Sequence, residues 1–468
     1  MKIRILLLFV LINYCFAQHA TLIFNNKTYA NDTLFLLIER DFISKIIDTI
    51  SIVKLDKDGK GTTTIFCKEP FFVAVPLYKY RIWFCVEPNQ TYTLFIPNKT
   101  LLSIEDSLNA YFKPLDFYAP TIPYDTNITQ NAIIELNNTI DSILEKHLKN
   151  IKYNIKRKFV DSLINKIQNK FAYIKSNYFR NYLYYKIAWI KNLSYERDKN
   201  FIIKNYFSTN PILLNNLAYT ELFDEIFVDY LSYYSLTKWG ENVYANIARS
   251  KSPTELRKDL RKNPAILNDT LADLIILKGL HDAYFLKYLP NKVNFPTKQL
   301  IMTIDSMTIV AKTPELRQIA KNILRKIREK EQIDHLLENI PLYNSEGTEY
   351  YLRNFAGKYL YVSIMDFRAY NFLTEQKKIK ATCSRFSNKL RVINIVLNAN
   401  KANLEQIIKK EELFGEFLYP ANSEKFKKQL KISALPVFFI FSPTGKIINA
   451  NAPPPDENII SYFNNIIK

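Results

Sequence analysis

The stretch YVSIMDFRAYNFLTEQ, residues 361–376, has the pattern of a buried strand that runs directly into a helix. Its first half is a run of mostly apolar residues, and a helix is predicted over residues 372–388. The pattern continues with a buried strand over residues 390–397. A strand, a helix and a second strand in this order predict a βαβ unit with parallel strands.

The residues after this unit predict the rest of an α/β domain. We expect helices over residues 403–412 and 424–430, and then a hairpin of strands 437–441 and 446–449 across the turn SPTG. A helix over residues 458–467 closes the chain. A βαβ opening followed by two strands and a helix predicts a mixed sheet covered by helices.

Three segments of this region, taken in order, carry a family resemblance. KYLYVSIMDF, RVINIVLN and ISALPVFFIFSPTGKII resemble the successive strands of exported thioredoxin-like proteins of the TlpA/ResA type. The resemblance covers about residues 349–468 and implies a thioredoxin-like fold there, with the family's cis-proline at Pro436. Upstream, the helical run DTLADLIILKGLHDAYF and the β-rich N-terminus look like the modules that precede this domain in the family.

The chain departs from the family at the junction between strand and helix. Where the family has Trp-Cys-x-x-Cys, this chain reads Arg368-Ala369-Tyr370-Asn371-Phe372. Disulfide exchange needs a thiolate of low pKa at the helix N-terminus and a second thiol that resolves the mixed disulfide. Ala369 and Phe372 supply neither, so we expect a domain that is redox-inactive, and whether the protein is an enzyme stays open.

The resemblance also implies a binding role, because thioredoxin folds hold extended peptides beside the cis-proline loop. The protein is therefore interpreted as a peptide-binding, protein-binding or scaffolding module, with aromatic and cationic side chains suited to such contacts. The alternative is a thiol-disulfide oxidoreductase that uses a displaced cysteine. The candidate binding residues are Arg368, Ala369, Tyr370, Asn371, Phe372, Leu435 and Pro436.

Three cysteines, Cys67, Cys85 and Cys383, are candidates for a redox thiol at a displaced position, because Cys15 lies within the first 17 residues, which are predicted to be removed. Cys383 lies 11 residues beyond Phe372 on the same predicted helix, roughly 16 Å away. Its neighbours at helical spacing are apolar, which favours a buried structural thiol over a reactive one. Cys67 and Cys85 lie in nearby predicted strands, and either a disulfide or two isolated buried thiols fits that spacing.

The first 17 residues have the features of a secretory signal peptide. Lys2 and Arg4 precede an apolar run, and Cys15-Phe16-Ala17 has small residues at its first and third positions, which predicts cleavage before Gln18. The apolar run is shorter than the roughly 20 residues that span a membrane. The sequence thus predicts export to the periplasm or cell envelope, or secretion, with no transmembrane segment.

The rest of the chain divides by periodicity. Short runs rich in Val, Ile, Phe and Thr predict a β-sandwich over residues 18–115, and helical spacing predicts an all-helical domain over 116–345. The thioredoxin-like domain follows over 346–468, so the fold class is a multidomain α+β protein. Within the helical region, the aromatic cluster SNYFRNYLYYKIAWI is interpreted as core filler, with a ligand-stacking platform as the alternative.

Charge and metal-ligand patterns point to no further partner. The net charge of +19 comes from Lys and Arg interleaved with acidic residues, and no nucleic-acid motif accompanies them. The four histidines show no paired metal-ligand spacing, and in the EF-hand-like DKDGKG the residue Lys60 stands where an oxygen ligand belongs. We therefore expect no metal, no cofactor and no nucleic acid, and the sequence leaves the oligomeric state open.

Overall fold

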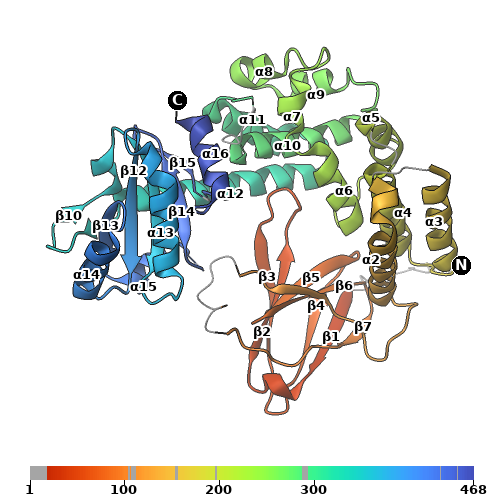
Figure 1. Cartoon of the computed structure of the whole chain (residues 1–468). Helices are drawn as coiled ribbons and strands as arrows, with labels where there is room; N and C mark the ends of the chain where they lie inside the picture. The colour runs from red at the N-terminus through yellow and green to blue at the C-terminus, as the bar shows by residue number, and fades with distance from the viewer. Residues whose placement is uncertain are drawn as a thin grey trace, which may run out of the picture.

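The computed structural model describes residues 18–103, 106, 112–152, 157–194, 198–286, 293–432, 434–450 and 452–467. The predicted signal peptide lies outside the described residues. Figure 1 shows a β-rich part, a helical part and a C-terminal α/β part in chain order, so the protein is a mixed α/β structure with several sheets.

The β-rich part consists of two sheets that share one apolar core. Alternation along the strands places residues such as Leu22, Leu36 and Phe84 between the sheets. The smaller sheet has the order β4 (Lys60–Phe66), β1 (His19–Asn25) and β7 (Thr91–Leu94). The larger sheet has the order β3 (Ile47–Lys54), β2 (Thr33–Glu39), β5 (Phe71–Leu77), β6 (Tyr80–Val86) and β8 (Leu115–Tyr118). The boundary expected after residue 115 falls inside β8, which pairs in parallel with β6.

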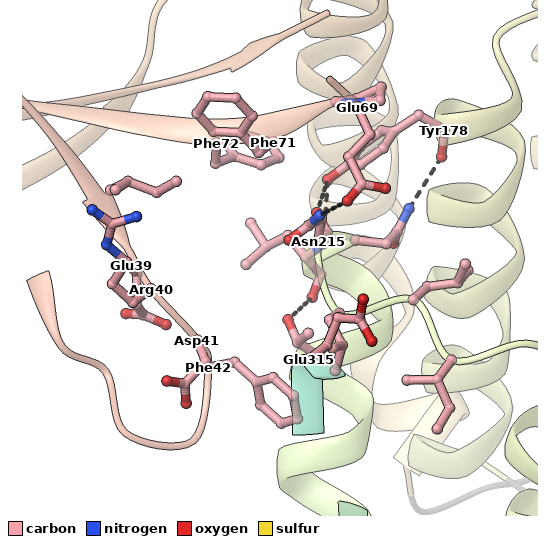
Figure 2. A pocket seen from close by; sticks show the side chains of 18 of the residues that line it. Glu39, Arg40, Asp41, Phe42, Glu69, Phe71, Phe72, Tyr178, Asn215 and Glu315 are labelled. Carbon is pink, nitrogen blue, oxygen red and sulfur yellow. Dashed lines mark hydrogen bonds between the residues drawn. The ribbon is translucent and has the colours of Figure 1, made fainter. Parts of the chain in front are cut away.

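The tip of the hairpin between β2 and β3 enters the helical part. Phe42 and Ile43 are buried in the helical core, and the Phe42 ring lies 5.5 Å from that of Phe223 in a T-shaped contact. Beside them, Asp41, which Figure 2 labels next to Phe42, accepts a hydrogen bond of 2.8 Å from the Asn322 side chain. The hairpin tip therefore holds the β-rich part against the helices through both apolar and polar contacts.

We expect Phe42→Ala to lower the free energy of unfolding by about 3 kcal/mol, because it leaves a cavity in the helical core. Phe35 lies on the same hairpin but is 44% exposed, so Phe35→Ala is the matched control and should change stability little. Urea titrations followed by circular dichroism measure both. Equal losses of unfolding free energy in Phe42→Ala and Phe35→Ala would contradict the inference that the hairpin tip holds the β-rich part against the helices.

The helical part surrounds one interior helix. Residues on all sides of α10 (Asp269–Phe285) are buried, as expected for a helix enclosed by others. The Asn268 and Thr313 side chains cap the helices that follow them, since each accepts from a backbone N–H of the first turn. The other elements are α2 (Thr129–Lys152), α3 (Arg157–Lys170), α4 (Asn177–Leu193), α5 (Lys199–Ile202), η2 (Ile203–Ser208), α6 (Leu217–Phe227), α7 (Tyr230–Tyr234), α8 (Val243–Ala245), η3 (Asn246–Ser250), α9 (Pro253–Leu260), α11 (Thr297–Val310) and α12 (Pro314–Asn339).

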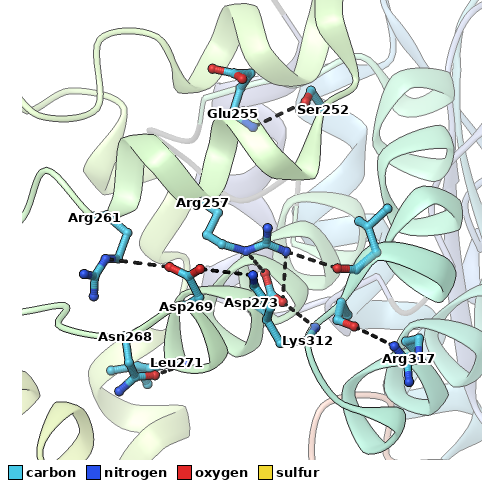
Figure 3. Close-up of polar contacts among 12 residues, drawn as sticks. Ser252, Glu255, Arg257, Arg261, Asn268, Asp269, Leu271, Asp273, Lys312 and Arg317 are labelled. Atoms are coloured by element: carbon cyan, nitrogen blue, oxygen red, sulfur yellow. Dashed lines mark hydrogen bonds and ion pairs between the residues drawn. The ribbon is translucent and has the colours of Figure 1, made fainter.

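A buried ion pair fixes the packing of these helices (Figure 3). The Arg257 guanidinium of α9 donates to both oxygens of Asp273 on α10, at 2.7 and 3.1 Å. The same carboxylate accepts from the backbone N–H of Lys312, and Arg257 also donates to the Val310 carbonyl. Because each charge is satisfied, the pair ties the loop before α12 to the interior helix.

The aromatic cluster of α4 also packs as expected, with Phe179, Tyr182 and Tyr185 in the core.

Helix α12 connects the helical part to the C-terminal part. Its first two-thirds contribute Ile323 and Ile327 to the helical core, whereas Leu337 near its end packs into the core of the C-terminal sheet. The two parts therefore share one continuous helix. The boundary expected after residue 345 falls inside the following hairpin, because β9 (Leu342–Tyr343) already belongs to the C-terminal sheet.

The C-terminal part is a seven-stranded mixed sheet with the order β10-β9-β13-β12-β11-β14-β15. β11 (Tyr359–Asp366) and β12 (Leu390–Leu397) are parallel along their whole length, and β14 (Val437–Phe441) runs antiparallel to β11. This arrangement agrees with the thioredoxin-like fold that the resemblance implies. The remaining elements are β10 (Glu349–Tyr350), η4 (Leu352–Phe355), α13 (Phe372–Cys383), η5 (Ser384–Phe386), α14 (Lys401–Glu411), β13 (Glu416–Pro420), α15 (Ser423–Gln429), β15 (Ile447–Asn449) and α16 (Glu457–Ile466).

The sequence analysis missed three strands of this sheet, β9, β10 and β13. Each has five residues or fewer, and β13 ends in a proline, so none shows an alternating pattern. A glycine at the entrance of β13 was the available signal. Gly415 has a φ of +101°, and a Cβ there would lie 2.8 Å from the Val392 carbonyl oxygen, so only glycine fits beside β12.

Candidate functional site

The junction between β11 and α13, residues 366–372, is a tight turn. The Phe367 N–H donates to the Leu397 carbonyl, which extends the pairing with β12 by one bond. The Ala369 N–H then donates to the Asp366 carbonyl at 3.1 Å, and the Phe372 N–H donates to the Ala369 carbonyl at 3.0 Å. Backbone hydrogen bonds alone thus define this turn between strand and helix.

The structure brings the junction and Pro436 to the same end of the sheet. The antiparallel register pairs Ser363 with Phe438 and Ile364 with Val437, so Pro436 lies one step further, opposite Met365. The Leu435–Pro436 bond is cis, as the resemblance implies. Leu435 lies outside the ladder, and both residues of this pair, here called the proline loop, are half-buried. A second cis bond, Ile122–Pro123, was not predicted.

Asp366 organises the junction. Its carboxylate accepts from the Arg368 guanidinium at 3.0 and 2.9 Å and from the Arg368 backbone N–H at 2.9 Å. The Asn398 side chain donates a further bond of 2.7 Å. Burial alone would raise the pKa of Asp366, but these bonds outweigh it and hold the pKa below its usual value. Arg368 is thereby held beside the turn while most of its side chain stays exposed.

We expect Asp366→Asn to lower the free energy of unfolding by about 1–2 kcal/mol at pH 7, since it weakens charge-assisted bonds of which one partner is exposed. The folded-state pKa is depressed, so this contribution is complete above the ordinary value of 3.8 and disappears as the pH falls through the folded-state pKa. Thermal unfolding from pH 7 to pH 2 should show the wild-type and variant curves converging in acid. Asp58→Asn, at an exposed turn, is the control. A difference in stability between the wild type and Asp366→Asn that stays constant with pH would contradict a stabilising role for the ionised Asp366 carboxylate.

The candidate binding residues at the junction separate into outward and inward side chains. Tyr370 is 65% exposed and Arg368 is also exposed, whereas Ala369 and Asn371 are half-buried. Phe372 does not fit the expectation that it contacts a peptide. It is buried in the core under α13, with its ring 5.5 Å from that of Phe367, because the first residue of the helix turns toward the sheet. Phe372 thus anchors the start of α13 in the apolar core.

The described cysteines are all buried free thiols. Cys383 is fully enclosed at the end of α13, and burial raises its pKa to about 12. Burial likewise raises the pKa of Cys67 to about 11 and that of Cys85 well above its usual range. A thiol with a raised pKa holds little thiolate at neutral pH, so none of the three has the properties of an exchange nucleophile.

The disulfide considered between Cys67 and Cys85 is not formed. Cys67 packs in the core between the two β-sheets and directs its thiol to the carbonyls of Glu69 and Val86. Cys85 packs instead against the helical core. The two side chains pack in different cores, because Cys67 lies between the two β-sheets and Cys85 lies where the β-rich part contacts the helices.

Sequence reasoning missed a buried polar cluster behind the junction. The Ser363 hydroxyl donates to the Asn394 side-chain oxygen at 2.7 Å, and the Gln376 amide of α13 donates to the same oxygen at 3.2 Å. Asn394 in turn donates to the Phe414 carbonyl. The signal was present, because Ser363 and Asn394 each lie between apolar neighbours in the middle of a buried strand. These bonds tie α13 to the two central strands and fix the direction in which the helix leaves the junction.

No group of three or more metal-ligating side chains occurs within the described residues. Across the same ranges, no helix is both long enough and apolar enough to cross a membrane.

Comparison with known proteins gives similarity to solved structures only. No family model matches the chain, and no curated protein matches it. A thioredoxin domain of a thiol-disulfide oxidoreductase from Bacteroides vulgatus is 14% identical over 28% of this chain and 93% of that one, with a TM-score of 0.25. An uncharacterized thioredoxin-like protein from Porphyromonas gingivalis is 20% identical over 28% and 90%, with a TM-score of 0.25. A secreted disulfide oxidoreductase from Mycobacterium tuberculosis is 12% identical over 28% and 96%, with a TM-score of 0.23.

Proposed function

We propose that the protein is an exported, redox-inactive thioredoxin-like protein that binds an extended peptide or protein segment at the end of its C-terminal sheet. The binding surface consists of Arg368, Tyr370, Leu435 and Pro436. The signal-peptide pattern of the first 17 residues supports export to the cell envelope.

The proposal rests on the residues at the junction between β11 and α13. In the sequence resemblance Ala369 and Phe372 stand where the family has its two cysteines, and the Phe372 ring is buried in the core. The described cysteines lie elsewhere, with raised pKa values and no exposure. Loss of the chemistry with retention of the turn and the cis proline favours binding over catalysis.

The exposed groups around the junction support binding of an extended chain. Tyr370 offers an aromatic ring at little cost in conformational entropy, and Arg368 is already held by Asp366. The Leu435 backbone lies outside the ladder of β14, beside the place where a further extended segment can align. Backbone bonds of this kind supply affinity, and neighbouring side chains supply specificity.

We expect the chain to reduce insulin with dithiothreitol no faster than the buffer control, because each cysteine that the structure describes is a buried thiol. Insulin precipitation measured by turbidity tests this, with Cys383→Ser run in parallel. Activity above the control that disappears in Cys383→Ser would overturn the proposal and establish a displaced-thiol oxidoreductase.

Peptides selected from a random display library against the wild-type chain should bind through the proposed surface. We expect Tyr370→Ala to raise their Kd about tenfold or more, as for an aromatic residue at the centre of an interface. Tyr173→Ala removes a tyrosine of similar exposure from a remote loop and serves as the control. If both variants bind the selected peptides equally well, the site lies elsewhere.

A further inference from the structure

A large cavity lies where the β-rich part meets the helical part, far along the chain from the thioredoxin-like junction. Its volume is about 910 Å³, within the range of ligand sites, and such sites favour the contacts between structural units. The β2–β3 hairpin, the segment before β5, the start of α4, the loop before α6 and the start of α12 form its walls (Figure 2). It is partly open, so a ligand can enter without rearrangement of the walls.

The lining is acidic in a strongly basic protein. Glu39, Asp41, Glu69, Glu87 and Glu315 line the cavity, and the one cationic lining residue is Arg40. Arg40 is already bound to Asp48 at 2.6 Å. The chain carries a net charge of +19, so five carboxylates around one cavity run against its overall composition. The cavity therefore selects for positive charge.

The five carboxylates have no ion-pair partners among the described residues, and neutral donors hold three of them in place. The Asn215 amide donates to Glu69 at 2.6 Å, and the Thr129 hydroxyl donates to Glu87 at 2.8 Å. Asp41 is held in the same way by Asn322. These bonds orient the carboxylates without an ion pair, and the nearby cations Lys45 and Lys326 act on Glu39 and Asp41 from outside the lining, so the cavity itself presents mainly negative charge to a ligand.

Glu39 lies on the wall opposite Glu69 and can still be reached by water (Figure 2). The surrounding protein removes part of its hydration, and this desolvation raises the pKa of its carboxyl, because the opposing effect of the nearby cations Lys45 and Lys326 is smaller. A ligand cation near Glu39 would stabilise its charged form.

The other walls suit a peptide that carries such a cation. Phe71, Phe72 and Tyr178 are half-buried and present apolar and aromatic surface for an aliphatic stem or a guanidinium plane. Side-chain amides, including those of Asn177 and Asn181, also line the cavity. An amide donates and accepts like the peptide group itself, so these residues can pair with a ligand backbone.

We propose that this cavity binds a peptide segment bearing lysine or arginine, separately from the surface at Tyr370. Carboxylates pair with the cationic heads, the aromatic wall contacts the stems, and the amides pair with the backbone. This role is independent of the thioredoxin-like junction.

Fluorescence anisotropy with the chain from Gln18 onward tests the proposal at 150 mM salt, which screens non-specific attraction. The probe is a labelled nonapeptide of alternating Lys and Leu, and the comparison peptide replaces Lys by Glu. We expect saturable binding of the basic peptide only, with Kd raised about five- to tenfold by Glu39→Gln or Glu69→Gln. Competition by free lysine amide at equal concentration would show that the cation suffices without a peptide and would overturn the peptide assignment.

Matched variants separate local contacts from net charge and from folding. Glu346→Gln removes the same charge at an exposed loop outside the cavity and should leave Kd unchanged. Glu69→Asp retains the charge and should retain most of the affinity, whereas Tyr370→Ala should have no effect. Binding of the acidic peptide, or an equal loss of affinity in Glu346→Gln, would overturn the proposal, as would absence of binding to the folded wild-type chain.

Discussion

The contact between the β2–β3 hairpin and α12 is the constraint on which the arrangement of the protein depends. Apolar burial of Phe42 and Ile43 supplies most of the stabilisation, and the bond from Asn322 to Asp41 fixes the orientation. Because α12 also carries Leu337 into the core of the C-terminal sheet, the same helix contacts all three parts. The cavity exists because this contact holds the β-rich walls at a set distance from the helices.

The bonds around Asp366 hold the turn between β11 and α13 without any thiol. Phe372 adds apolar packing beneath the helix. The outer surface of the turn carries the exposed Tyr370, and the half-buried proline loop lies at the same end of the sheet.

Charge distribution links the two proposed sites. The chain is basic overall, yet the cavity between the β-rich and helical parts is lined by five carboxylates that form no ion pair among the described residues. Long-range repulsion slows the approach of a basic peptide, whereas the short-range field inside the cavity favours it. Selectivity in this arrangement comes from the local geometry, since a basic peptide gains nothing elsewhere on a basic surface.

The sequence by itself determined most of the element types, the helix caps at Asn268 and Thr313 and the place of Pro436, because these follow from local pattern and from order along the chain. Only the tertiary structure decided that Phe372 points inward, that Cys67 and Cys85 pack in different cores, and that β13 completes the sheet. It also decided that β8 pairs with the β-rich sheet and that α12 runs from the helical core into the C-terminal core. The cavity could not be predicted from the sequence, because its carboxylates lie on segments between Glu39 and Glu315 that are far apart along the chain. Long-range packing brings these segments together, and a local pattern carries no information about which distant faces meet.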